Sequence, residues 1–199
     1  MAAAIMVFAA FCELMVIVGS WIGSAMSASQ NITSLLSAEG VRWYIGSFAD
    51  ILATPYLVWI ILVGITLGVV SGSGIVDALR CQIRGERQEF IERLSLNAAE
   101  VLAAVIVAVV LFLICAPHAV LLSATGTISD SSFSAGIVPI MAFLFSAPSL
   151  VYGLCASKFR SATSIFYAIK KGVTKMVPVI VLYIFVTHLA ITIIKIFNI

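Results

Sequence analysis

The amino-acid sequence predicts an all-α polytopic membrane protein with about five transmembrane helices and further amphipathic helices at the interface. Hydrophobic residues make up 62% of the 199 residues, charged residues only 10%, and the mean hydropathy is +1.19. A soluble domain is typically about 45–50% apolar and about 25% charged. The composition therefore excludes a soluble globule, a disordered chain and a nucleic-acid-binding domain, because each of these classes needs more charge.

Five apolar segments are long enough to cross the hydrocarbon core, which takes about 20 helical residues. They cover residues 3–26, 55–70, 98–116, 135–156 and 176–197. Each should be helical, because an isolated segment in lipid satisfies its backbone in no other way. The first segment has no Lys or Arg before it and contains Glu13, so it is interpreted as a retained span and not as a signal peptide. Residues 1–199 are thus expected to form one integral membrane domain.

Three polar segments between the spans are expected to be helical as well. Ser37 can cap a helix over residues 38–53, whose apolar side chains recur at the spacing of a helix lying in the membrane interface. Residues 77–96 carry charges of both signs and indicate a solvated helix. Residues 161–173 indicate a basic amphipathic helix on the membrane surface.

The basic residues also predict an orientation. Nine of the eleven Lys and Arg residues follow the second or the fourth span, and the positive-inside rule makes these two segments cytoplasmic. Five spans then give a cytoplasmic N-terminus and an external C-terminus. A bacterial inner membrane fits this arrangement best.

Two titratable residues lie deep in predicted spans, Glu13 in the first and His188 in the fifth. An ionisable group at that depth is costly and is a functional-site hypothesis by default. The two side chains could pair and form a proton-titratable couple on a substrate or ion path. The alternatives are a glutamate bonded to a neighbouring helix and a histidine satisfied by a serine or a carbonyl.

Prolines and glycines supply further candidates. Pro139 and Pro148 lie in the fourth span, where they could bend the helix beside a substrate or ion path or produce a kink used for packing. Gly64, Gly68 and Gly72 form a repeated small-x-x-x-small stripe. This stripe predicts close helix packing, either within the chain or in a dimer.

The basic segment after the fourth span is a candidate for contact with anionic lipid or a partner protein. It could equally be an ordinary positive-inside loop. Its basic residues are Lys158, Arg160, Lys170, Lys171 and Lys175.

Enzymatic and metal-dependent functions find no support in the sequence. The four cysteines have no C-x-x-C spacing and no Cys/His cluster, so neither a metal site nor a cofactor is expected. Ser/His/Asp arrangements and phosphate-binding glycine loops are also absent from the sequence. No nucleic acid is expected as a partner.

Two passages resemble the p-aminobenzoyl-glutamate transporter family of bacterial membrane proteins. The first runs from Ala38-Glu-Gly-Val-Arg-Trp43 through Gly64–Gly74 to Ser73-Gly-Ile-Val-Asp-Ala-Leu-Arg80. The second runs from Phe133-Ser-Ala-Gly-Ile-Val-Pro-Ile140 to Pro148-Ser-Leu-Val-Tyr-Gly153, and Met176–Leu182 fits the segment that follows. The similar stretches cover about two thirds of the chain.

The resemblance implies a scaffold more than a transport core. Members of this family are longer and carry membrane hairpins rich in Ser, Asn and Asp, which have no counterpart here. Deep polar side chains are also few in the five predicted spans, although ion-coupled transport needs them. The expected function is a structural or partner-binding membrane subunit, surrounded by lipid and working as a homodimer or within a larger complex. The alternatives are a reduced ion-coupled transporter of an organic anion such as p-aminobenzoyl-glutamate, and a membrane anchor that recruits partners through its basic helix.

Overall fold

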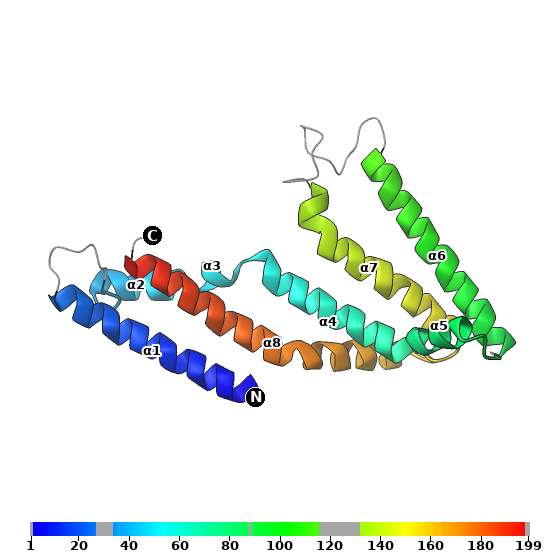
Figure 1. Cartoon of the computed structure of the whole chain (residues 1–199), viewed down its shortest axis with the longest axis horizontal. Coiled ribbons are helices and arrows are strands. Elements are labelled where there is room, and N and C mark those ends of the chain that lie inside the picture. The colour runs from blue at the N-terminus through cyan, green and yellow to red at the C-terminus, as the bar shows by residue number, and fades with distance from the viewer. Residues whose placement is uncertain (1, 27–33, 88, 116–131, 198–199) are drawn as a thin grey trace. The chain divides into compact units, whose positions relative to one another are not determined.

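The computed structural model describes residues 2–26, 34–87, 89–115 and 132–197 (Figure 1). Within these ranges every regular element is a helix, which confirms the all-α fold class. The helices are α1 (Ala2–Met26), α2 (Ala38–Gly46), α3 (Phe48–Leu52), α4 (Pro55–Ser73), α5 (Ile75–Ile83), α6 (Phe90–Cys115), α7 (Ser132–Cys155) and α8 (Ala162–Phe197). Among them α1, α4, α6, α7 and α8 are long and apolar enough to cross a membrane.

The chain divides into two compact units. The first consists of Met1–Ile60 together with Val177–Ile199, and the second is Ile61–Met176. The helices α4 and α8 contribute residues to both units. Each unit has its own polar contacts, and the candidate residues are distributed between the two.

In the first unit the interfacial segment is held by serine hydroxyls. Ser37 caps α2 by accepting the Gly40 N–H at 3.1 Å. Ser20 of α1 accepts the Leu35 N–H at 3.2 Å, where both residues are buried. The structure divides the segment expected as one helix over 38–53 into α2 and α3. The division falls at Ser47, whose ψ of −1° departs from helical geometry while its N–H still bonds Trp43 O.

In the second unit the charged segment 77–96 is likewise divided. The helix α5 ends in a Schellman motif, in which the Glu86 N–H reaches Cys81 O and the Gly85 N–H reaches Gln82 O. Gly85 occupies the left-handed position of this motif with a φ of 68°, a conformation that few other residues tolerate. Part of the expected solvated helix therefore belongs to α6, which begins at Phe90.

The core of the second unit lies where α5, α6 and α7 meet, as Figure 1 shows. Its buried members are Ile75, Ala78, Leu96, Ala99 and Tyr152. Burial of such apolar side chains fixes α5 and the start of α6 against the last turns of α7.

Helix α8 differs most from the sequence prediction. The basic segment 161–173 and the fifth span 176–197 were expected as separate elements, yet Ala162–Phe197 is one helix of 36 residues. Nothing between them ends a helix, because Gly172 keeps a negative φ and Pro178 is accommodated inside the helix. The basic segment is thus continuous with the fifth candidate span and not a separate helix, and its place at the membrane surface stays a prediction.

Candidate functional site

A carboxylate, an imidazole and a phenol meet in the first unit. Glu13 of α1 and His188 of α8 are 175 positions apart in sequence, and His188 Nδ1 lies 2.7 Å from Glu13 Oε1. The Tyr44 hydroxyl of α2 donates to the same oxygen at 2.7 Å. The side chains of His188 and Glu13 are only 3% and 12% exposed. The geometry pairs Glu13 with His188 and equally satisfies the alternative of a glutamate bonded to neighbouring helices, while their role on a substrate or ion path stays a prediction.

Two aromatic rings pack against the imidazole of His188 in this network. The Tyr44 ring meets the His188 ring edge-on at 4.7 Å between centroids, and Phe48 lies 5.1 Å from it. Burial and the hydrogen bond to Glu13 raise the pKa of Tyr44 to about 12, so the phenol stays protonated and donates. Where Glu13 is ionised its carboxylate only accepts, and Nδ1 of His188 then carries the hydrogen of their contact.

Further contacts join the same elements. The hydroxyls of Thr54 and Tyr183 are hydrogen-bonded to each other. Lys195 Nζ lies 5.8 Å from the centre of the Trp43 ring, within cation–π range. The segment 38–54 therefore contacts the second half of α8 at three places. These are the Glu13 network, the Thr54–Tyr183 hydrogen bond and the Lys195–Trp43 contact.

Pro139 and Pro148 lie inside α7, which continues through both residues. Pro139 lines a hollow of about 390 Å³ whose other walls are Val, Ile and Phe side chains of α6 and α7. Pro148 lines a second hollow of about 390 Å³, in which Glu100 and Ser149 are the polar wall residues. Both hollows offer mainly apolar surface and not a set of cation ligands, and their role on a transport path stays a prediction.

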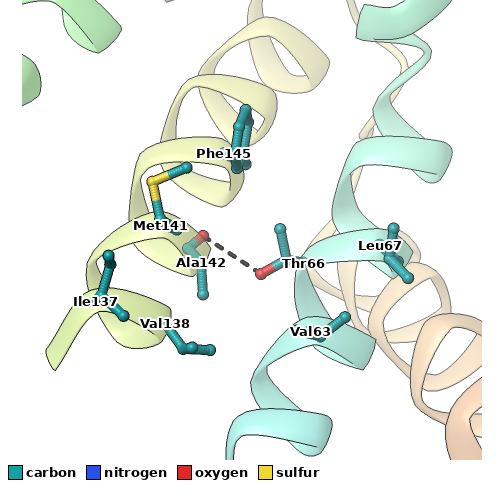
Figure 2. A pocket seen from close by; sticks show the side chains of 8 residues that line it. All are labelled: Val63, Thr66, Leu67, Ile137, Val138, Met141, Ala142 and Phe145. Carbon is teal, nitrogen blue, oxygen red and sulfur yellow. Dashed lines mark hydrogen bonds between the residues drawn. The ribbon is translucent and has the colours of Figure 1, made fainter. Parts of the chain in front are cut away.

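A third hollow lies between α4 and α7 (Figure 2). It measures about 340 Å³, and Thr66 is the polar side chain in its wall. The Thr66 hydroxyl donates to Leu62 O of its own helix at 2.9 Å and lies 3.3 Å from Ala142 O of α7. Because the Thr66 hydroxyl is already hydrogen-bonded to these carbonyls, the hollow presents mainly apolar groups. Such a surface suits lipid chains or an apolar side chain.

The glycine stripe of α4 is covered by α8 of the same chain. A Cβ added to Gly64 would lie 3.0 Å from Met176 Cγ and 3.3 Å from Val173 Cα. A Cβ on Gly68 would meet the Ala168 carbonyl, and a Cβ on Gly172 would meet the Gly64 carbonyl. The stripe that includes Gly72 thus lets two helices approach within one chain, as small residues do in membranes.

The five basic candidates lie in the second unit, and all are exposed. Lys158 Nζ donates to Glu92 Oε1 at 3.0 Å, and this bond raises the pKa of Lys158. Ala168, Gly172 and Met176 face α4 at four-residue spacing. By helical geometry Lys170 therefore projects away from α4, while Lys171 and Lys175 lie toward one edge of the α4-facing side, and Arg160 precedes the helix.

Sequence reasoning missed three features of these sites. Tyr44 was assigned to an interfacial helix, where nothing local indicates a bond to a residue 31 positions away. The ion pair of Lys158 with Glu92 joins two segments that were each interpreted as solvated. Thr192 follows His188 by four positions, and that helical spacing could have indicated a shared face.

Comparison with known proteins gives one match. The family model described as the AbgT putative transporter family matches residues 80–199, which is more than half of the chain. No curated protein and no solved structure matches the chain. The matched region contains α6, α7 and α8, and therefore His188, both prolines and all five basic candidates.

Proposed function

This chain belongs to the AbgT putative transporter family, and on that premise we propose that it is a membrane-scaffold subunit whose exposed helix faces bind partner helices of a transport assembly. Its membrane helices leave much apolar surface uncovered. In each of the described spans, at most 22% of the most apolar 18-residue stretch is buried within the chain. Lipid can cover such faces, so the proposal depends on a different observation.

The observation that carries the proposal is the position of Lys175 along α4. Gly64 is the tenth of the 19 residues of α4, and its neighbours on α8 are Val173 and Met176. Lys175 therefore lies beside the middle of a helix that needs nearly its whole length to cross about 30 Å of hydrocarbon. A lysine at the centre of a membrane helix costs about 2.5–3.5 kcal/mol on insertion scales. Carboxylates of a partner helix would remove much of that cost.

A carbodiimide that enters membranes tests this contact, because it joins a lysine amine to a carboxylate only where the two touch. We expect crosslinks from Lys170, Lys171 or Lys175 to an acidic residue of a second polypeptide, identified by peptide mapping in native membranes. The crosslink should disappear when all three lysines are replaced by glutamine. The Lys158–Glu92 pair, with its 3.0 Å separation, is the internal positive control.

Two results would count against the scaffold role. One is a crosslinked sample that contains the Lys158–Glu92 product and no product from the three lysines of α8. The other is a mass measurement in mild detergent that finds only the single chain, with or without bound lipid. A mass of two chains would instead make the partner a second copy.

A second candidate function is a reduced ion-coupled transporter of an organic anion, for which p-aminobenzoyl-glutamate is the first substrate to test. The enclosed Glu13–His188–Tyr44 network favours it, because buried ionisable groups in membranes mark proton and ion paths. Flux in vesicles that is lost in Glu13→Gln would support this function. Absence of flux under both a sodium and a proton gradient would eliminate it.

The proposal includes a bacterial inner membrane and a cytoplasmic N-terminus. Cys81 of α5 is then cytoplasmic, and an impermeant thiol reagent should label it in inside-out vesicles once Cys12, Cys115 and Cys155 are replaced by serine. Desolvation and the hydrogen bond to Glu86 raise the pKa of Cys81, so labelling should need more alkaline conditions than a free thiol. Labelling only in right-side-out vesicles would reverse the orientation.

A further inference from the structure

Two buried polar atoms of the first unit have no hydrogen-bond partner among the described residues, and both belong to α8. They are Nε2 of His188 and Oγ1 of Thr192. The two residues are only 2% and 0% exposed. Buried polar atoms in native proteins nearly always bond to a protein atom or to an ordered water. We therefore expect each of these two atoms to have a hydrogen-bond partner that the described residues do not supply.

The two residues lie one helical turn apart in α8, so a single small partner between them could reach both atoms. Residues four apart lie on one face of a helix, and the side chain of Thr192 covers the turn that precedes it, where His188 begins. Nδ1 of His188 is engaged by Glu13, so Nε2 is the nitrogen that needs a second partner, accepting in a neutral ring and donating in a charged one. The threonine hydroxyl both donates and accepts. A molecule with two donor hydrogens and an acceptor oxygen satisfies both atoms.

We propose that one water molecule binds between His188 and Thr192 and bridges their free polar atoms. The inference is independent of the scaffold role. The ligand must be small, because the rings of Tyr44 and Phe48 already crowd the imidazole at 4.7 and 5.1 Å. It is not a metal ion, since the described residues contain no group of three His, Cys, Asp or Glu side chains that could hold one.

The bound water completes a hydrogen-bonded chain across the first unit. The chain runs from Tyr44 of α2 through Glu13 of α1 and His188 of α8 to the water and Thr192. It gives both ring nitrogens of His188 a partner, Glu13 at Nδ1 and the water at Nε2. A bridging water is nearly as favourable enthalpically as a direct hydrogen bond, so it satisfies the two buried atoms.

The test uses the full chain in lipid vesicles with ¹⁵N-labelled histidine. The protein has two histidines, so His118→Gln leaves His188 as the only labelled side chain. We expect transfer of magnetisation from water protons to Nε2 of His188 in this parent and in Thr192→Ser. We expect loss of that transfer in Thr192→Val, which keeps the shape of threonine and removes its hydroxyl.

Two outcomes would overturn the proposal. One is a parent protein in which Nε2 receives no magnetisation from water. The other is a Thr192→Val protein that retains the transfer, which would mean that the water at Nε2 does not bridge to the threonine hydroxyl. If Thr192→Val does not fold, the infrared spectrum of the parent decides. An internal O–H band that shifts in H₂¹⁸O supports the bound water, and its absence excludes it.

Discussion

Replacing Gly172 by alanine should lower the free energy of unfolding by about 2 kcal/mol or more. The added methyl group would meet the Gly64 carbonyl and the backbone of Gly68 on α4. Backbone atoms cannot rotate away as side chains do, so α4 and α8 must separate and lose packing along the stripe. Reversible unfolding in mixed micelles, followed by circular dichroism, measures the change.

Gly19→Ala is the matched control, because Gly19 also lies inside a membrane helix. A Cβ there would have no neighbour within 4 Å. An alanine inside a helix is favoured over glycine by about 1 kcal/mol, so this variant should be as stable as the parent or more stable. Equal losses in the two variants would mean that α4 and α8 do not approach as closely as the structure shows.

Replacing Glu13 by alanine should cost about 2–5 kcal/mol of unfolding free energy. The substitution removes the acceptor of two hydrogen bonds of 2.7 Å and leaves the Tyr44 hydroxyl and His188 Nδ1 without it. Each buried polar group that loses its partner costs about 1–3 kcal/mol. Glu13→Gln keeps one carbonyl oxygen as an acceptor and should therefore lose less. The same unfolding measurement compares the two variants.

Glu39→Ala is the matched control, because it removes a glutamate that does not belong to the Glu13–His188–Tyr44 network. Glu39 lies exposed in the first turn of α2. Its interaction with the helix dipole contributes about 0.3–1 kcal/mol, so the control should change stability little. A Glu13→Ala protein as stable as Glu39→Ala would show that the network contributes nothing to the fold.

The sequence located the candidate residues better than it located their partners. Glu13 and His188 stand out because an ionisable side chain in an apolar run is rare, and this requires no knowledge of the fold. Tyr44 does not stand out, since a tyrosine on an amphipathic helix is normal at a membrane interface. Its bond to Glu13 depends on how α2 lies against α1, which local sequence does not encode.

Helix ends show the same difference. The start of α2 after Ser37 was predicted because a serine hydroxyl at the cap can accept the backbone N–H three residues later, here that of Gly40. The end of α5 at Gly85 was missed, although glycine is the residue that a Schellman motif favours. The division between α2 and α3 at Ser47 has no strong residue signal, so it could only be seen in the structure.

The sequence by itself determined that this is a helical membrane protein with five candidate spans and a place in a transporter family. Composition and apolar length fix these properties, because lipid allows an isolated apolar segment only the helical form. The tertiary structure decided that Gly64 and Gly68 face α8, that Lys175 lies beside the middle of α4, and that Glu13 meets both His188 and Tyr44. These facts depend on which helix faces another and at what register. Many registers bury similar apolar surface, and only packing and hydrogen bonds between distant residues select one of them.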